Sequence, residues 1–361
     1  MRVAVAMSGG VDSGVSAFLL KEKGFDVVGL FMASGIEGED PTACRPGACC
    51  SEADAEDARA TAGAIGVPFY AVNCKPQFRA LADSFVEEYL AGRTPNPCVR
   101  CNTRIKFGHL FDFAAKIGAG AIATGHYARI REEADGHALL RGADPSKDQS
   151  YFLFELASSV LARTMFPVGD LRKTEVRETA HRAGLPVRDK PDSQDVCFAG
   201  RGGYAGFIEK AAAGRIRPGE IVDSSGCVLG RHEGIHLFTV GQRRGLRIAS
   251  SRPLFVLRIL PGEARVVAGP EEELLVREFS VVETSWRERP PAGRSLEAGV
   301  QVRYRQRPFP ATVRDAGEGR AFVVPANPLK GVTPGQAAVF YRGDEVLGGG
   351  WITGSSARNA E

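Results

Sequence analysis

The chain has 361 residues, of which 43% are hydrophobic and 25% are charged. This length and composition predict a globular protein of two or three domains with a sizeable buried core. No run approaches 18 consecutive apolar residues, and the N-terminus begins a predicted strand rather than a signal peptide. We therefore expect a cytoplasmic protein without a membrane partner.

The net charge of +3 is unevenly distributed along the chain. Residues 1–200 carry 23 Lys and Arg against 26 Asp and Glu, whereas residues 201–361 carry 23 against 17. Six arginines of the second part have only Glu233 as an acidic neighbour in the sequence: Arg231, Arg243, Arg244, Arg247, Arg252 and Arg258. Such a cluster is compatible with nucleic-acid binding or with an ordinary solvated surface.

The first predicted elements are a buried strand, Val3 to Met7, and a helix, Ser13 to Lys23, joined by a Gly-rich turn. Residues 8 to 13 read Ser-Gly-Gly-Val-Asp-Ser. The glycines let the backbone approach an anion at the helix N-terminus, the serines offer hydroxyl donors, and Asp12 is suited to hold Mg²⁺. The turn lacks the Lys of the P-loop and the glycine spacing of the dinucleotide-binding motif. It resembles the loop of enzymes that split ATP into AMP and pyrophosphate; the alternative is a turn that only joins strand to helix.

The next elements continue the alternation of strands and helices. Strands are predicted at 27–32, 69–72 and 121–124, and helices at 52–65, 78–91 and 105–117. This order predicts an α/β domain with a Rossmann-like parallel sheet, in which ligands bind at the carboxyl ends of the strands. Gly125-His126-Tyr127 follows the fourth strand and is expected at that edge.

The character of the chain changes after two further predicted helices, 150–163 and 173–183. Short alternating runs with Gly and Pro between them predict strands at 254–259, 264–267, 278–282, 300–304, 321–324 and 337–341. This pattern is typical of a small β-barrel or sandwich. We expect a catalytic domain over 1–204, a small central domain over 205–272 and a C-terminal β-barrel over 273–356.

The chain contains eight cysteines, which in a cytoplasmic protein indicate metal or redox chemistry rather than a disulfide framework. Cys98 and Cys101 form a C-x-x-C in a loop that two prolines stiffen, and four nearby basic residues favour the thiolate. The alternative is half of a zinc site, but the second C-x-x-C or His pair that tetrahedral zinc needs is missing at the usual spacing. Cys44, Cys49 and Cys50 stand in an irregular stretch. They could form a metal site or be incidental loop cysteines.

Taken in order, the motifs resemble those of the bacterial tRNA-specific 2-thiouridylase family, which converts the wobble uridine of certain tRNAs to 2-thiouridine. The resemblance runs nearly from end to end. It rests on Ser8 to Ser13, Thr94-Pro95-Asn96-Pro97, Thr124 to Tyr127, Lys147 to Tyr151, Asp192 to Phe198, Phe238 to Leu246, Arg303 to Gln306 and Thr333 to Gln336.

The resemblance implies a role for each matching position. ATP would bind Ala6, Met7, Ser8, Gly9, Gly10, Val11, Asp12 and Ser13, with Met32 and Gly125 near the adenosine. The target base would contact Asn96, Pro97 and Cys98, and the tRNA would contact His126, Lys147, Asp148, Gln149, Arg303, Tyr304 and Gln336. The residues alone also allow structural roles, such as a packed His126, a solvated Lys147–Asp148 pair and a buried Cys197.

The reaction that the resemblance implies proceeds by activation and sulfur transfer. ATP adenylates O2 of the uridine, which turns this oxygen into a leaving group as AMP. Cys197 carries the incoming sulfur as a persulfide that a persulfide carrier protein supplies, and Cys101 then forms a disulfide with Cys197.

One position departs from the family pattern, because Cys98 stands where Asp follows Asn-Pro in the familiar form. Cys98, Cys101 and Cys197 could instead supply three thiolates to a [4Fe–4S] cluster whose open iron delivers sulfide. Two other functions are weighed beside thiolation: a tRNA-binding sensor of iron or redox state, and a different ATP-dependent synthetase with the same loop. The sequence leaves the tRNAs, the sulfur donor and the oligomeric state open.

Overall fold

The computed structural model describes residues 1–35, 52–192, 196–199, 202–287, 289–290 and 294–355. Cys44, Cys49 and Cys50 lie outside these ranges. The described chain forms two compact units: unit 1 contains Met1–Ala82, Pro97–Gly203 and Asp344–Val346, and unit 2 contains Asp83–Asn96, Tyr204–Gly343 and Leu347–Glu361. No helix among the described residues is long and apolar enough to cross a membrane.

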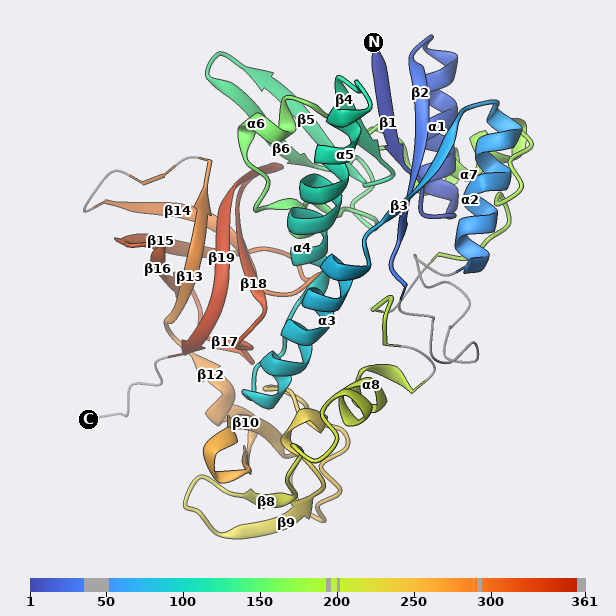
Figure 1. The fold of residues 1–361 in the computed structure, drawn as a ribbon. Coiled ribbons are helices and arrows are strands. Elements are labelled where there is room, and N and C mark those ends of the chain that lie inside the picture. The colour runs from blue at the N-terminus through green and yellow to red at the C-terminus, as the bar shows by residue number, and fades with distance from the viewer. Residues whose placement is uncertain (36–51, 193–195, 200–201, 288, 291–293, 356–361) are drawn as a thin grey trace. The chain divides into compact units, whose positions relative to one another are not determined.

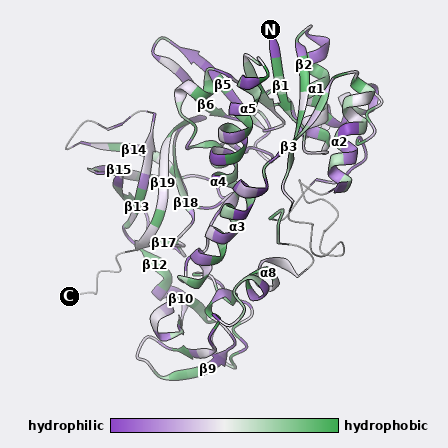
Figure 2. Ribbon diagram, viewed as in Figure 1, coloured by the Kyte–Doolittle hydropathy of each residue, from purple (hydrophilic) through white to green (hydrophobic). Residues whose placement is uncertain are grey.

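Unit 1 is built on a parallel sheet of five strands in the order β3-β2-β1-β4-β7, which confirms the predicted α/β class. The central strands are continuous buried apolar runs, as expected for a parallel sheet that is covered on both faces (Figures 1 and 2). The strands are β1 (Arg2–Ala6), β2 (Asp26–Ala33), β3 (Phe69–Asn73), β4 (Ala121–Thr124) and β7 (Thr164–Met165).

The helices of unit 1 bury their apolar sides against this sheet and against one another. One cluster joins Val3 and Val5 of β1 to Ala17 and Leu20, and another joins Val15 to the helix after residue 172. The helices are α1 (Val11–Glu22), α2 (Glu52–Ile65), α3 (Lys75–Leu90, which continues into unit 2), α4 (Pro97–Arg100), α5 (Leu110–Lys116), α6 (Ser158–Leu161) and α7 (Lys173–Arg182).

Three predicted segments of unit 1 differ from the structure. The helix expected over 105–117 is a π-helix, η1 (Cys101–His109), followed by α5. The helix expected over 150–163 is wrong, because a 3₁₀ turn, η2 (Ser150–Leu153), and α6 replace it. An antiparallel hairpin, β5 (Ala128–Glu133) and β6 (Gly136–Arg141), was not predicted; Glu345 pairs with Leu140 of β6.

Unit 2 contains two β assemblies, the end of α3 and most of α8 (Gly203–Ala211). The first is a four-stranded sheet in the order β10-β11-β8-β9, with β8 (Gly219–Val222), β9 (Val228–His232), β10 (Phe255–Leu260) and β11 (Arg265–Gly269). Two short 3₁₀ turns, η3 (Ile235–Leu237) and η4 (Pro261–Glu263), lie between its strands, and a third, η5 (Glu271–Leu274), follows β11.

The second assembly is a closed barrel, because β13 pairs with both β16 and β19. Its strands follow the order β13-β16-β15-β14-β18-β19 around a core of Val, Phe and Ala side chains. They are β13 (Phe279–Trp286), β14 (Ser295–Gln301), β15 (Phe309–Gly317), β16 (Arg320–Pro325), β18 (Ala337–Arg342) and β19 (Glu345–Ser355), beside a small pair, β12 (Leu275–Val276) and β17 (Leu329–Lys330). The strand predicted over 300–304 ends at Gln301, so Arg303 and Tyr304 lie in the following turn.

Candidate active site

The turn between β1 and α1 has the geometry of a phosphate cradle. Gly9 has a φ of +71°, and a Cβ at this position would lie 2.3 Å from the carbonyl oxygen of Asp54. The hydroxyl of Ser13 donates to the carbonyl of Gly10 at 3.0 Å and accepts the amide N–H of Ser8 at 3.1 Å. These contacts fold the turn tightly over the positive end of α1, which is the arrangement that binds phosphate.

The remaining predicted ATP residues support this turn in different ways. The side chains of Met7 and Val11 are buried in the two hydrophobic clusters of unit 1, so only their backbones are available to a nucleotide. A Cβ at Gly125 would lie 2.7 Å from the amide nitrogen of Ser13, so glycine permits the loop after β4 to touch the start of α1. Met32 is buried near the end of β2.

Asp12 is the centre of a charged network beside the turn. Its Oδ1 accepts hydrogen bonds from the Tyr127 hydroxyl at 2.8 Å and from Lys173 Nζ at 2.7 Å. Burial, and then the nearby charge of Asp12, raise the pKa of Tyr127, so this phenol stays a donor at neutral pH. Lys173 begins α7, and its side chain is only 12% exposed.

Asp192 connects the same lysine to two further cations. Lys173 Nζ lies 2.8 Å from its Oδ1, Lys147 Nζ lies 2.7 Å from its Oδ2, and Arg177 Nη2 lies 3.1 Å from its Oδ1. Burial opposes the charge of Asp192, but the hydrogen bonds and charges of Lys147 and Lys173 together outweigh it and lower its pKa to about 2. The carboxylate of Asp192 therefore links Lys147 to the turn over residues 8–13, which we call the nucleotide turn.

Lys190 holds the turn from the other side. Its Nζ donates to the carbonyl of Gly9 at 3.0 Å, to Asp54 Oδ1 at 2.6 Å and to Asp57 Oδ2 at 2.5 Å. Burial opposes this charge, yet the two carboxylates outweigh it and raise the pKa of Lys190. Lys190 thus binds the nucleotide turn directly, and Asp192 is linked to it through Lys173.

Two residues predicted to contact tRNA, His126 and Asp148, are buried in unit 1. His126 is 8% exposed, its Nδ1 lies 2.7 Å from Thr124 Oγ1, and its ring packs between Phe107 and Phe166. Burial, and then the charge of Lys106, hold its pKa well below the usual range, so it is neutral. Asp148 is 9% exposed and accepts hydrogen bonds from Arg141 and Ser150. His126 matches the packed alternative, whereas Asp148 is buried and paired with Arg141 rather than solvated beside Lys147. Contact with tRNA stays a prediction for both.

Gln149 connects this region to the nucleotide turn. Its side-chain Oε1 accepts a hydrogen bond from the backbone N–H of Tyr127 at 2.9 Å, and its backbone N–H donates to the Tyr127 carbonyl at 2.9 Å. Because the Tyr127 hydroxyl binds Asp12, the loop over 147–149 and the turn over 8–13 belong to one hydrogen-bonded assembly.

The C-x-x-C motif lies where α4 passes into the π-helix. Cys98 is exposed, whereas Cys101, the first residue of the π-helix, and Cys197 are half-buried. Rare π-helical turns occur frequently at functional sites. Within the described ranges no three His, Cys, Asp or Glu side chains are grouped to hold a metal ion, so the structure gives no support to a cluster on Cys98, Cys101 and Cys197.

The other predicted contacts lie in unit 2. The strap Thr94 to Asn96 is bonded to the barrel, because Gln336 Nε2 donates to the Thr94 carbonyl at 2.8 Å and the Thr94 amide N–H donates to the Pro334 carbonyl at 2.8 Å. Arg303 Nη2 donates to the carbonyl of Gly331 at 2.6 Å, and the guanidinium of Arg305 lies over the Tyr304 ring. Asn96 is buried at the end of this strap.

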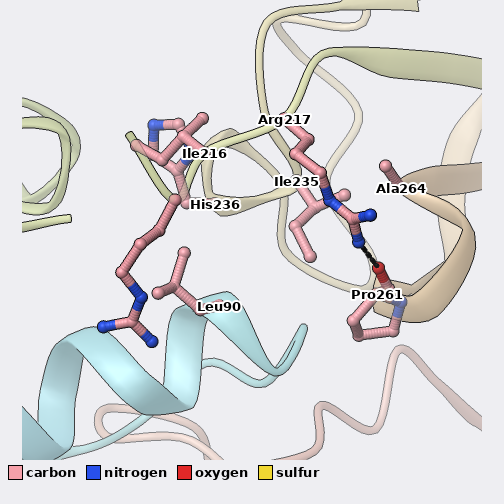
Figure 3. A pocket seen from close by; sticks show the side chains of 8 residues that line it. Leu90, Ile216, Arg217, Ile235, His236, Pro261 and Ala264 are labelled. Atoms are coloured by element: carbon pink, nitrogen blue, oxygen red, sulfur yellow. Dashed lines mark hydrogen bonds between the residues drawn. The ribbon is translucent and has the colours of Figure 1, made fainter. Parts of the chain in front are cut away.

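Unit 2 also contains a cavity that the sequence did not indicate. Figure 3 shows Leu90, at the end of α3, facing a wall that includes Arg217, Ile235 and Pro261. Arg217 donates to the carbonyl of Pro261 at 3.3 Å, and Arg215, which also lines the cavity, is paired with Glu87. These contacts engage both guanidinium groups within the protein.

The sequence analysis missed Lys173 and Lys190 as site residues. One signal was present for Lys173, since a cation at the first position of a helix opposes the helix dipole and needs another reason to stand there. Lys190 gave no such signal, because its partners lie more than 130 positions away.

Together, the parallel sheet, the Gly-rich turn and the surrounding cations define an α/β enzyme domain of the kind that holds the phosphates of ATP. The tRNA methyl transferase HUP domain matches residues 1–201, a PRC-barrel domain of the same family matches 205–270, and an aminomethyltransferase β-barrel domain matches 276–352. The chain belongs to the tRNA-specific 2-thiouridylase family.

Three relatives named tRNA-specific 2-thiouridylase MnmA carry this assignment. The protein of Geobacter metallireducens is 50% identical over 97% of this chain and 96% of its own length. The proteins of Rhodospirillum centenum and Geotalea uraniireducens are 48% and 46% identical, over 99% and 97% of this chain and 93% and 94% of their own lengths.

Proposed function

We propose that this protein is an ATP-dependent sulfurtransferase that converts the wobble uridine of tRNA to 2-thiouridine. The observation that carries the proposal is the identity of 46–50% with thiouridylases over nearly the whole chain. The tight Gly-rich turn and its charged network support it, because a protein that only senses or binds tRNA does not need a phosphate cradle. A cytoplasmic location, where tRNA is available as substrate, is part of the same proposal.

The nucleotide turn binds and orients ATP for adenylation of the uridine. Backbone amides of residues 8–13 and the ammonium group of Lys173 would hold the phosphates, since Lys173 already lies beside the turn. The carboxylate of Asp12 fits Mg²⁺, which uses one or two carboxylates together with substrate phosphates. When bound, Mg²⁺ neutralises phosphate charge. O2 of the uridine attacks the α-phosphorus and pyrophosphate leaves.

The sulfur step uses two cysteines of unit 1. The outer sulfur of a Cys197 persulfide attacks C2 of the adenylated base and expels AMP, which leaves the base joined to Cys197 through a disulfide. The thiolate of Cys101 then attacks Sγ of Cys197, which releases 2-thiouridine and leaves a Cys101–Cys197 disulfide for a dithiol reductant to reopen. Two cysteine sulfurs are oxidised as the transferred sulfur is reduced, so the electrons balance.

Asn96, Pro97 and Cys98 would hold the base, and Lys147 and Gln149 would meet the tRNA. In this scheme the sulfur comes from a persulfide-carrying protein, whereas sulfide would be the donor only in the cluster route. Cys98 replaces the acidic residue of the familiar form, and its exposed thiol has no assigned step in this scheme.

The deciding experiment measures 2-thiouridine at the wobble position by mass spectrometry after incubation of anaerobically purified protein with ATP, Mg²⁺ and tRNA. Each of two sulfur donors, a persulfide-carrying protein and inorganic sulfide, is tested before and after iron is stripped. We expect product with the persulfide donor in both samples. Activity that requires sulfide and disappears with iron would instead establish the cluster route.

Matched cysteine variants give the control for this assay. C101S and C197S are expected to lose at least about 100-fold in turnover, since each removes a reacting sulfur. C227S, at an exposed turn of unit 2, is expected to retain full activity. Absence of product with both donors would favour the sensor or another synthetase.

A further inference from the structure

The start of the π-helix is fixed to a second segment by one carboxylate, that of Glu155. Oε1 of Glu155 accepts a hydrogen bond from Arg100 Nη1 at 3.0 Å, and Oε2 accepts one from Thr103 Oγ1 at 2.8 Å. These two donors stand on either side of Cys101. The Glu155 side chain is 9% exposed, so solvent screens the contacts weakly.

A third contact strengthens the same attachment. Asn102 Nδ2 donates to the carbonyl of Phe152 at 3.1 Å, and Asn102 is 2% exposed. Three anchors, at residues 100, 102 and 103, therefore connect residues 98–103, which we call the cysteine loop, to residues 152–155.

The other end of that segment is attached to the nucleotide turn. Gln149 exchanges two hydrogen bonds with Tyr127, whose hydroxyl binds Asp12. The Asp148 carboxylate binds the amide and hydroxyl of Ser150, so the bend between the two ends is also fixed. Residues 148–155 thus run from the phosphate cradle to Cys101, and we call them the connecting segment.

We infer that Glu155 is a positioning residue for Cys101, which sets the place of this thiol relative to the nucleotide turn through the connecting segment. The inference rests on the proposed function for its consequence, because Cys101 must reach Sγ of Cys197 after AMP has left. Displacement of a reacting group by about 1 Å can cost as much as 10²-fold in rate. The hydrogen bonds of Glu155 to Arg100 and Thr103 lie at the cysteine loop rather than at the nucleotide turn, so we expect its loss to slow sulfur transfer more than adenylation.

The test compares E155A and E155Q with wild type in a single turnover that records both released AMP and released 2-thiouridine. We expect AMP release within about twofold of wild type and 2-thiouridine release slower by about 10-fold or more in E155A. A tRNA–protein adduct that a reductant cleaves is expected to accumulate. E155Q, which can still accept from Thr103 but lacks the ionic partner for Arg100, is expected to lie between the two.

A second measurement does not require activity. Trypsin cleaves after Arg93, Arg100 and Arg104, which places Cys98 and Cys101 on separate peptides. Mass spectrometry after brief iodoacetamide treatment therefore gives the alkylation of Cys101 relative to Cys98 in one sample. We expect this ratio to rise at least about threefold in E155A, since a released loop exposes the half-buried thiol.

The matched control is E88Q, which breaks the bidentate pair between Glu88 and Arg93, residues that lie before the cysteine loop. E88Q is expected to leave unchanged both the ratio of 2-thiouridine to AMP release and the ratio of Cys101 to Cys98 alkylation. Equal ratios in wild type, E155A and E155Q would overturn the role of Glu155, as would a proportional loss of AMP and 2-thiouridine in both variants. If wild type makes no 2-thiouridine, the proposed function fails, whereas the alkylation ratio still decides the role of Glu155.

Discussion

Lys173 is the residue on which the charges around the nucleotide turn converge. Its ammonium group lies between Asp12 and Asp192, within 2.8 Å of each, and 5.9 Å from the centre of the Tyr127 ring. A cation held this way can turn from its carboxylates to a triphosphate with little loss of side-chain entropy. In the proposed reaction, Lys173 would stabilise the charge that develops as pyrophosphate leaves.

We predict that K173M lowers the rate of AMP formation by about 10²- to 10³-fold, the range found when a preorganised group at a transition state is removed. Methionine preserves much of the aliphatic stem, and K173R, which preserves the charge, should recover part of the rate. The measurement is AMP released per enzyme with saturating tRNA. K116A, at the exposed end of α5, is the control and should match wild type. A wild-type rate in K173M would exclude Lys173 from the phosphate site.

At the scale of elements, the turn between β1 and α1 depends on two glycines with different roles. Gly9 needs its positive φ and the space beside the Asp54 carbonyl. Gly10 precedes α1 with an extended φ of −100°, and a Cβ there would meet only Ser8 Oγ at 3.5 Å. A side chain at position 9 would therefore strain the backbone, whereas a side chain at position 10 would affect only the approach of a ligand.

We predict that G9A lowers the urea midpoint of the nucleotide-free protein, since a left-handed alanine alone costs roughly 1–2 kcal/mol and the clash with Asp54 adds to it. G10A should leave that midpoint near the wild-type value. Both variants should weaken ATP binding, because a side chain at either position changes the approach of phosphate to the backbone. Equal midpoints for G9A and wild type would contradict the strain argument.

Sequence periodicity predicted the elements of unit 1 that have a simple pattern. The strands near Val3, Val27 and Ile122 and the helix over 52–65 were found because their burial follows the period of each element. The segment over 150–163 failed because its apolar residues suit a helix, whereas Asp148 and Gln149 commit the backbone at its start to other partners. The nucleotide turn was predictable from local order, but Lys190 and Glu155 act through long-range contacts that a sequence pattern does not contain.

At the scale of the whole molecule, the division into units does not follow the order of the chain. The strap Thr94 to Asn96 belongs to unit 2 through Thr94, Gln336 and Thr239, whereas Pro97 and the cysteine loop belong to unit 1. The expected boundaries, 204 and 272, were drawn along the sequence and did not include this exchange. Of the residues predicted to hold the target base, Asn96 therefore belongs to unit 2, and Pro97 and Cys98 belong to unit 1.

Within unit 1, Asp192 joins its own segment to two other parts of the chain: the loop at Lys147, and α7 through Lys173 and Arg177. Its pKa of about 2 in the folded protein lies below the value of about 3.9 expected for an unfolded chain. The charged carboxylate therefore stabilises the fold above about pH 4, and this contribution is lost as the pH falls through the folded pKa.

We predict that D192N lowers the free energy of unfolding of unit 1 by roughly 1–2 kcal/mol at pH 7, with the same deficit at pH 5 and a smaller one at pH 3. The measurement is urea unfolding of wild type and variant at each pH. D189N, whose carboxylate is 74% exposed beside Arg188, is the matched control and should shift by no more than about 0.5 kcal/mol. A deficit for D192N that stays constant down to pH 3 would show that Asp192 acts through packing rather than through its charge.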